Sequence, residues 1–470
     1  MPIDRRQFIK LMGSSGAALY TLGMLGGCES LLEQIRNRPI RRNISTLANN
    51  DPIVEAYRAA VSAMKALPNS DRRNWTRQAE IHNDFCPHGN WYFLPWHRAY
   101  LYYFETIIRQ LSGYKDFALP YWNWTCQPKM PAHFFGAGNS LFNATRTKGA
   151  TDSVPDSYTG EDILADILDI SDFENFGSFE STALRNGSGG GFGELEGTPH
   201  NLVHGWIGGD MGGYMSPLDP IFWCHHNMIE RCWWEWNISR GNPNPNSNNW
   251  YELSLGGMFC DKEGNLINNL TVGTTALMPL LSYQFDDQLV PCSNIIKGFS
   301  PIPLNKSTAE LREFLEKGGP FRIKALDQIK AESLERIVVH GQQENTIKLP
   351  NAVRKLLMAE SLTNRRYILK VNNASIKETR DVFVRLFINP PKGHALRDKD
   401  NLYYAGSFAF FEDGKHAQHA GGNTYHIDIT NTIKRLKEKS LLKDGEDLSI
   451  SLVAVSILDG KSIPRGRVEL

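Results

Sequence analysis

The chain lacks an excess of charge of either sign. Its 470 residues include 51 Lys and Arg and 51 Asp and Glu, so the formal net charge at pH 7 is zero. A surface that binds nucleic acid normally shows as a basic excess, and this balance therefore argues against a nucleic-acid partner. Hydrophobic content of 41% and charged content of 22% are those of a soluble globular protein. At this length two domains are expected.

Several common motifs are also missing. No CxxC pair suggests structural zinc or thioredoxin chemistry. The glycine-rich stretch at 187–193 (GSGGGFG) is not followed by Lys-Ser/Thr, so it is read as a surface loop and not as a phosphate loop. Six cysteines follow Cys28, and the sequence does not determine how they pair.

No apolar run is long enough to be a convincing membrane span. The run from Leu11 to Leu25 is too short and too rich in glycine. It follows a twin-arginine export signal, RRQFIK, and ends in LGGC, which resembles a bacterial lipoprotein cleavage box. We therefore expect a signal peptide at 1–27, lipid on Cys28 and a polar tether at 28–49; a plain signal or an uncleaved anchor is the alternative. The protein would then lie in the periplasm or at the cell surface, tethered to a membrane through its lipid.

Histidines are concentrated in the first half of the chain, where eight of the 13 lie between residues 82 and 226. His97 begins an apolar stripe with helical spacing that continues through Leu101 to Leu111, so its side chain is expected to point inward. A helix expected to begin at Asp71 places His82 on the same face as Trp75. An earlier helix is expected from an Asp51 cap and Pro52 to about residue 67.

A second group of histidines lies between residues 200 and 226. His200 and His204 are four residues apart, which lets them bind one ion from one helical face. Asn201 follows His200 where a zinc protease would have glutamate, so that class is disfavoured. In the helix expected after Asp219-Pro220, the apolar spacing selects His226 as the inward ligand. His225 is turned about 100° away, into a supporting position.

Two groups of three inward histidines indicate a metal centre. Six neutral imidazoles without a carboxylate favour a transition metal, and copper stands highest in the affinity order. Two such sites held near each other could bind O2 between them. The alternatives are a zinc hydrolase and a set of unrelated core histidines, and the second would need chance placement of each.

These residues resemble the type-3 copper proteins, the tyrosinases and catechol oxidases. Residues 88–105 fit the first copper signature of the family, and residues 219–230 fit the second. Glu230 stands where the family usually has Asp. Residues 121–124 (YWNW) and 283–285 (YQF) resemble two further aromatic motifs, and residues 404–408 (YAGSF) resemble the shielding domain of plant polyphenol oxidases.

The resemblance implies a four-helix bundle holding two copper ions, with O2 as co-substrate and small phenols as substrates. The implied ligands are His82, His88 and His97 for the first copper and His200, His204 and His226 for the second. It also implies a thioether crosslink between Cys86 and His88. Glu196 and Asn201 resemble the pair that holds a basic water in members that hydroxylate monophenols. His225 and Glu230 are expected to support the ligands.

The resemblance and the residue patterns together predict two domains. A mainly α catalytic domain at 50–295 would be followed by a linker at 296–349 and a β-sandwich at 350–470. Strands are expected at 367–371, 382–388, 402–411 and 448–457, with one short helix at 429–439; His416, His419 and His426 are read as loop histidines. The C-terminal domain is expected to be a lid that keeps the enzyme latent, or a lectin-like binding module. Within the function, a catechol oxidase without hydroxylase activity and a non-catalytic O2- or copper-binding protein remain open.

Overall fold

The computed structural model describes residues 38–286, 289, 292, 344–347, 367–374, 382–391, 396, 402–410, 423–442 and 448–456. The expected export signal at 1–27, the lipidation site Cys28, His416 and His419 lie outside these residues, as does most of the expected linker at 296–349. Within the described part, no helix is both long and apolar enough to cross a membrane.

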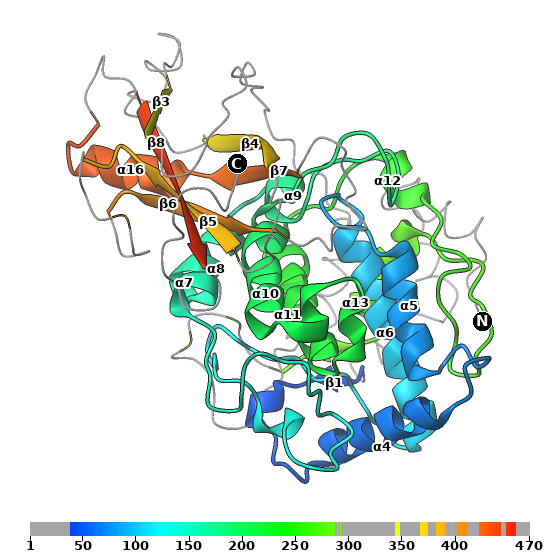
Figure 1. Cartoon of the computed structure of the whole chain (residues 1–470). Helices are drawn as coiled ribbons and strands as arrows, with labels where there is room; N and C mark the ends of the chain where they lie inside the picture. Colours follow the sequence, from blue (N-terminus) through cyan, green and yellow to red (C-terminus); the bar gives the residue numbers. More distant parts are fainter. Residues whose placement is uncertain are drawn as a thin grey trace, which may run out of the picture.

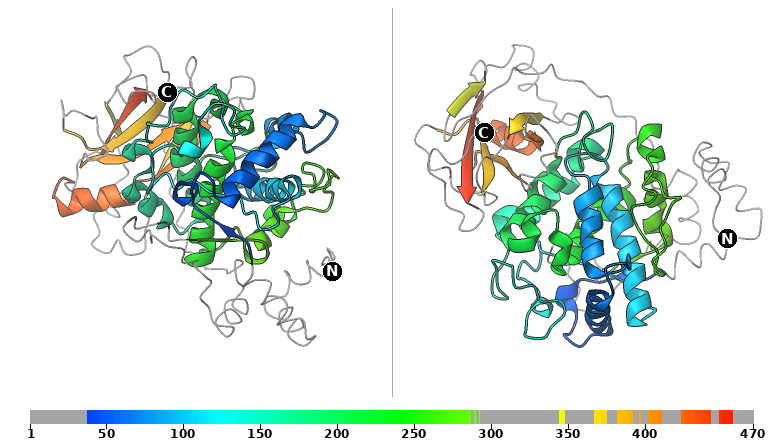
Figure 2. Two further views of the ribbon diagram at one scale, coloured as in Figure 1. Left: turned by 90° about the horizontal axis from the view of Figure 1, so that it is seen from below. Right: turned by 45° about the vertical axis from the view of Figure 1, so that its right-hand side comes forward.

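Six helices frame the first part of the chain. They are α4 (Pro52–Ala66), α5 (Trp75–Phe85), α6 (Phe93–Ser112), α10 (Asn201–Ile207), α11 (Ile221–Trp234) and α13 (Val272–Leu281). Between α6 and α10 the chain is mostly loops with the short helices α7 (Asp156–Thr159), α8 (Glu161–Leu168) and α9 (Phe173–Phe176), and α12 (Asn248–Glu252) follows α11. Figures 1 and 2 show α5 and α6 side by side, with α10 and α11 next to them. The expected mainly α core is therefore present.

Two helix starts show how local capping set the boundaries. The cap expected at the first helix is confirmed, because the Asp51 side chain accepts a hydrogen bond from the Ile53 amide at 2.9 Å. The start expected at Asp71 is wrong. Asn74 caps α5 by accepting from the Thr76 amide, while Asp71 pairs with Arg73 at 2.7 Å.

The core of this part is aromatic. Phe104 of α6 and Trp223 of α11 stack with ring centroids 3.4 Å apart. All residues of α11 are buried, including those outside its expected apolar face. Helical phase therefore identified the face toward α6 correctly but did not show that His225 is buried as well.

Residues 38–49, which were expected to belong to a polar tether, pack onto the helical core instead. Strand β1 (Ile40–Arg41) pairs in parallel with β2 (Gln284–Phe285). Arg41 is fully buried and donates to Glu105 of α6 at 2.8 Å. The sequence placed Arg41 in a solvated segment, but the Glu105 carboxylate, 64 residues away, neutralises its charge in the core. A disulfide between Cys126 and Cys292 also joins distant segments.

The C-terminal part contains two sheets, and the expected β-sandwich is not confirmed. Its strands are β3 (Glu344–Ile347), β4 (Ile368–Ala374), β5 (Val382–Ile388), β6 (Tyr404–Ala409), β7 (Asn423–Asp428) and β8 (Leu448–Ser456), with helix α16 (Thr430–Glu438). The order is β3-β8-β5-β6 in one sheet and β4-β7 in the other. Strand β7 was missed because polar residues interrupt its pattern, and the loop assignment of His426 is wrong: this residue is buried within β7.

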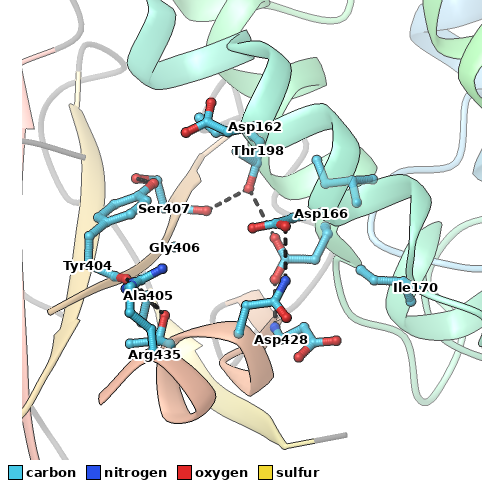
Figure 3. A pocket seen from close by; sticks show the side chains of 15 residues that line it. Asp162, Asp166, Ile170, Thr198, Tyr404, Ala405, Gly406, Ser407, Asp428 and Arg435 are labelled. Carbon is cyan, nitrogen blue, oxygen red and sulfur yellow. Dashed lines mark hydrogen bonds between the residues drawn. The ribbon is translucent and has the colours of Figure 1, made fainter. Parts of the chain in front are cut away.

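The C-terminal sheets lie against the helical core beside α8 and α9 (Figure 1). The contact is made by β6 and β7 on the segment at 192–201, which leads to the second histidine group. A pocket lies at this junction, with Asp162 and Asp166 of α8 on one side and Arg435 of α16 on the other (Figure 3). Glu194 and Asp428 also line this pocket, which is therefore rich in carboxylates.

Candidate metal centre

The first group of histidines forms one buried cluster. His82 lies on α5, His97 lies on α6, and His88 lies in the loop between these helices. Together with Cys86, each offers a ligand atom within 4.8 Å of the others. The structure thus brings together the three histidines that the sequence assigned to one metal.

The second cluster is built from the next pair of helices. His200 ends the π-helical turn η3 (Glu196–His200), His204 lies on α10, and His225 and His226 lie on α11. Their ligand atoms also lie within 4.8 Å of one another, and all four side chains are buried.

The two clusters face each other across a short gap. The rings of His97 and His226 are stacked with centroids 4.2 Å apart, and those of His88 and His200 are 5.5 Å apart. Phe93 packs against His200 at 4.8 Å, which closes one side of the gap with an apolar ring. Two metal ions held by these clusters would therefore be near neighbours.

Hydrogen bonds fix which nitrogen three of the rings present. The Nδ1 atoms of His82, His97 and His204 lie 2.7, 2.8 and 2.7 Å from the carbonyl oxygens of Tyr214, Phe93 and Met211. A carbonyl can only accept, so each Nδ1 carries the proton and each Nε2 presents its lone pair. This is the second contact that metal-binding histidines usually make.

The remaining nitrogens converge as a cation requires. The Nε2 atom of His226 lies 3.0 Å from that of His204 and 3.3 Å from that of His200. The Nε2 atom of His82 is buried without a hydrogen-bond partner. Several buried nitrogen donors gathered at one point can bind a cation, and nitrogen donors without a carboxylate suit copper. The residues therefore fit a pair of copper ions.

The histidines are held in the neutral form that binds a metal. Burial, the largest cause, lowers the pKa of His97 and of His204 to about 3. Burial and neighbouring histidines lower the pKa of His82, His88, His200 and His226 well below the ordinary value. No proton therefore has to be displaced from an imidazolium at neutral pH.

His225 differs from its neighbours in its hydrogen bonding. The indole N–H of Trp124 points at its Nδ1 atom at 3.2 Å. In a neutral ring the proton then lies on Nε2, which removes the lone pair that a metal needs. The supporting role expected for His225 stays a prediction.

Cys86 lies between two histidines of the first cluster. Its sulfur is 3.3 Å from His88 Nε2 and 3.4 Å from His97 Nε2. Burial raises the pKa of this thiol well above its ordinary value. The sequence named His88 as its partner, and the structure places the sulfur against both rings.

Glu196 and Asn201 lie beside different histidines. One carboxylate oxygen of Glu196 is 3.0 Å from His88 Nδ1, whereas the side-chain oxygen of Asn201 is 2.8 Å from His200 Nδ1. The Asn201 amide donates to the carbonyl of Ala409 in β6 at 2.8 Å. Burial raises the pKa of Glu196 to about 8, although hydrogen bonds from Ser178 and Gly89 lower it.

Glu230 holds the helices and does not touch a ligand. Its carboxylate accepts two hydrogen bonds from Arg98 Nε at 2.9 and 3.0 Å and one from the Tyr283 hydroxyl at 2.5 Å. Arg98 is next to His97 in sequence, so this ion pair joins α11 to the helix of the first cluster.

Sequence reasoning missed the residues that anchor the ligands. Phe93, Met211 and Tyr214 act through backbone carbonyls, which any residue type could supply, so the sequence carries no signal for them. Phe222 also packs on His226 at 4.2 Å, and its place on the apolar face of α11 could have suggested this contact.

Comparisons with known proteins agree with this geometry. A family model described as the common central domain of tyrosinase matches residues 63–165 and 142–239, and a model for a domain of unknown function matches residues 327–470. Tyrosinase HcTyr1 of Hahella sp. (strain CCB-MM4) is 26% identical over 92% of this chain and 98% of its own length. Polyphenol oxidase A1 of Vicia faba is 29% identical over 61% of this chain, which spans 53% of that protein.

Solved structures show the same fold. The structure of a latent aurone synthase, a polyphenol oxidase, superposes with a TM-score of 0.66 at 21% identity, covering 89% of this chain and 86% of that one. The structure of latent apple tyrosinase gives a TM-score of 0.64 over 89% of this chain and 94% of that one, also at 21% identity.

The fold and the paired histidine clusters are those of a dicopper protein of type 3. The chain belongs to the tyrosinase and polyphenol oxidase family, and it is an oxidoreductase of the tyrosinase type.

Proposed function

We propose that this protein oxidises o-diphenols with O2 to o-quinones and also hydroxylates monophenols. The observation that carries the proposal is the pair of buried histidine clusters facing each other across a gap lined by Phe93. His82, His88 and His97 would hold one copper and His200, His204 and His226 the other. When bound, the two coppers would supply O2 binding and the electron transfer that oxidises the phenol.

The chain's own contribution is orientation and proton handling. The carbonyl anchors keep the Nε2 lone pairs directed into the gap, and burial keeps the rings neutral. A monophenol must lose its hydroxyl proton before it is hydroxylated. Glu196 and Asn201, which lie beside opposite clusters, are our candidates for the pair that holds the accepting water.

We further propose that Cys86 and His88 become joined by a thioether, in which a bond between the sulfur and a ring carbon replaces the S–H and C–H bonds. O2 bound by the coppers would accept the two electrons and two protons released, and the bond would fix the His88 ring. The 3.3 Å approach of the sulfur to this ring supports the proposal, although His97 is almost as near. Mass spectrometry of the peptide that spans both residues would show the loss of two hydrogen atoms, and an unmodified peptide from copper-loaded protein would contradict it.

The C-terminal sheets are proposed to be a lid that makes the enzyme latent. Support comes from the contacts of β6 with Thr198 and Asn201, which flank His200 in sequence. Cleavage at a protease site introduced into the expected linker should raise catechol turnover. Unchanged turnover after complete cleavage would exclude the lid.

We also propose export by the twin-arginine route and a lipid anchor on Cys28, on the basis of the sequence alone. Labelling with a radioactive fatty acid, compared between the parent and Cys28→Ala, tests the anchor.

The function itself is tested by supplying catechol, tyrosine and tyramine side by side to the copper-loaded, linker-cleaved protein. We expect oxidation of all three. Turnover of catechol alone would support a catechol oxidase without hydroxylase activity. One contact favours this alternative while the lid is docked: the Asn201 amide donates to the Ala409 carbonyl and is then not available to a water. No turnover despite bound copper would leave a non-catalytic O2- or copper-binding protein.

A further inference from the structure

Among the described residues, the Nδ1 atom of His226 is buried without a hydrogen-bond partner, and one of the other five candidate ligands is anchored differently from the rest. Four histidines direct Nδ1 at a neutral acceptor: the carbonyls of Tyr214, Phe93 and Met211, and the amide oxygen of Asn201. His88 instead directs Nδ1 at the Glu196 carboxylate, 3.0 Å away. A carboxylate behind a metal-binding imidazole both fixes the ring and makes it a stronger donor.

His88 is also the ligand that no helix or π-helical turn positions. The other five lie on α5, α6, α10 and α11 or at the end of η3, where the backbone sets the direction of the side chain. His88 lies between α5 and α6, in irregular chain. Its ring therefore depends on contacts made by its side chain and by its neighbours in the loop.

Glu196 supplies two of these contacts at once. The oxygen that faces His88 also accepts the Gly89 amide at 2.9 Å, so one atom fixes the ring and the next peptide unit. Gly89 has φ +62°, and a Cβ there would lie 3.0 Å from the Phe192 ring, so this turn needs glycine. Glycine is thus what allows the loop to present both N–H groups to one carboxylate.

The carboxylate is itself held in place. Its second oxygen accepts a hydrogen bond from the Ser178 hydroxyl, and the side chain is fully buried. Glu196 therefore has little freedom to turn away from His88 without leaving buried N–H groups unsatisfied.

We propose that Glu196 is the positioning residue of His88, and that it selectively maintains the affinity of the first copper site. This inference rests on the proposed dicopper site but not on the phenol oxidase reaction. It differs from the water-holding role, because it requires the hydrogen bond to His88 and predicts an effect on copper itself.

The test is copper binding to the full-length protein in competition with a chelator. In Glu196→Ala we expect about 10- to 100-fold weaker binding of one of the two coppers, with the other unchanged. Glu196→Gln should bind both nearly as the parent does, because an amide oxygen can still accept from His88 and Gly89. In a His88→Ala background, Glu196→Ala should cause no further loss.

Glu194→Gln is the matched control. Glu194 lies two residues away, and its carboxylate accepts hydrogen bonds from the Asp428 amide at 2.7 Å and from the Thr198 hydroxyl at 3.5 Å. It should leave both affinities unchanged. Ser178→Ala keeps the Glu196 carboxylate but removes the hydroxyl that donates to it. This variant should lose less copper affinity at the same site. It replaces Glu196→Ala in the test if that variant fails to fold.

Parent-like affinity for both coppers in folded Glu196→Ala would overturn the proposal, as would equal weakening of both sites. If Glu196→Gln binds copper normally but no longer hydroxylates tyrosine, both roles of Glu196 hold. If the parent oxidises no phenol, the proposed function fails while the copper result still decides this inference.

Discussion

Replacing Glu230 should destabilise the catalytic domain strongly, because it would leave a buried cation unpaired. Arg98 is fully buried and its Nε atom donates to both Glu230 oxygens. Its two terminal nitrogens have no hydrogen-bond partner, and the guanidinium lies 3.3 Å above the Trp233 ring. In Glu230→Ala the charge would keep only that ring as a partner.

The size of the effect follows from this burial. Breaking a buried ion pair by removing one partner costs about 3–5 kcal/mol. For a domain of this size, each kcal/mol lowers the Tm by roughly 2–4 °C, so we expect a fall of about 6–20 °C. Glu230→Asp restores the residue usual in the family but is one methylene shorter, and it should cost less than Glu230→Ala.

Thermal unfolding followed by circular dichroism measures both variants. Glu263→Ala is the control, because the Glu263–Lys262 pair is about half exposed and should contribute little. If Glu230→Ala lowered the Tm no more than this control, the ion pair would not hold α6 and α11 together.

Three further predictions concern the lid, the disulfide and monophenol chemistry. Glu194 lies at the junction with the C-terminal sheets, and burial there raises its pKa to about 8. The docked state therefore binds the proton of Glu194 more tightly than the undocked state does. Docking should be strongest below pH 4.5, where Glu194 is protonated in both states, and should weaken as the pH rises toward 8. Catechol turnover of the uncleaved protein, relative to the cleaved protein, should therefore rise over this range, and less so in Glu194→Gln. Cys292→Ser should lower stability in urea by about 2–4 kcal/mol, since Cys126 and Cys292 close a loop across the domain. Asn201→Ala should reduce tyrosine hydroxylation more than catechol oxidation in the cleaved protein.

Each of these has an outcome that contradicts it. The pH prediction fails if catechol turnover has the same pH profile in Glu194→Gln and in the parent. His426 cannot account for a rise above pH 4.5, because burial lowers its pKa to about 3 and its protonation would favour undocking of the lid only at acidic pH. Equal urea midpoints for Cys292→Ser and the parent would show that the disulfide does not stabilise the domain. Equal losses of both activities in Asn201→Ala would assign Asn201 to anchoring His200 alone.

Helical phase and helical spacing predicted five of the six candidate ligands, because burial imposes a period on the sequence. His82, His97 and His226 lie on the inner faces of long helices, and His204 follows His200 by one turn. His88 lies outside any helix, so periodicity could not identify it, and the family resemblance supplied it. The sequence thus indicated the buried histidines of the two clusters to the extent that regular structure positions them.

What the sequence did not predict depends on contacts between distant segments. Arg41 was assigned to a tether because nothing near it in sequence shows that Glu105 would neutralise it. Strand β7 and its buried His426 were missed because pairing with β4, and not apolar alternation, makes this segment a strand. The pairing of Cys126 with Cys292 was likewise undetermined.

If both histidine clusters together form a copper site that oxidises phenols with O2, neither cluster should support the reaction alone. O2 uptake on addition of catechol, measured while copper is titrated into metal-free, linker-cleaved protein, tests it most directly. O2 uptake should rise until two coppers are bound per chain and should be lost in both His97→Ala and His226→Ala. Uptake no greater than that of the same amount of free copper would contradict it.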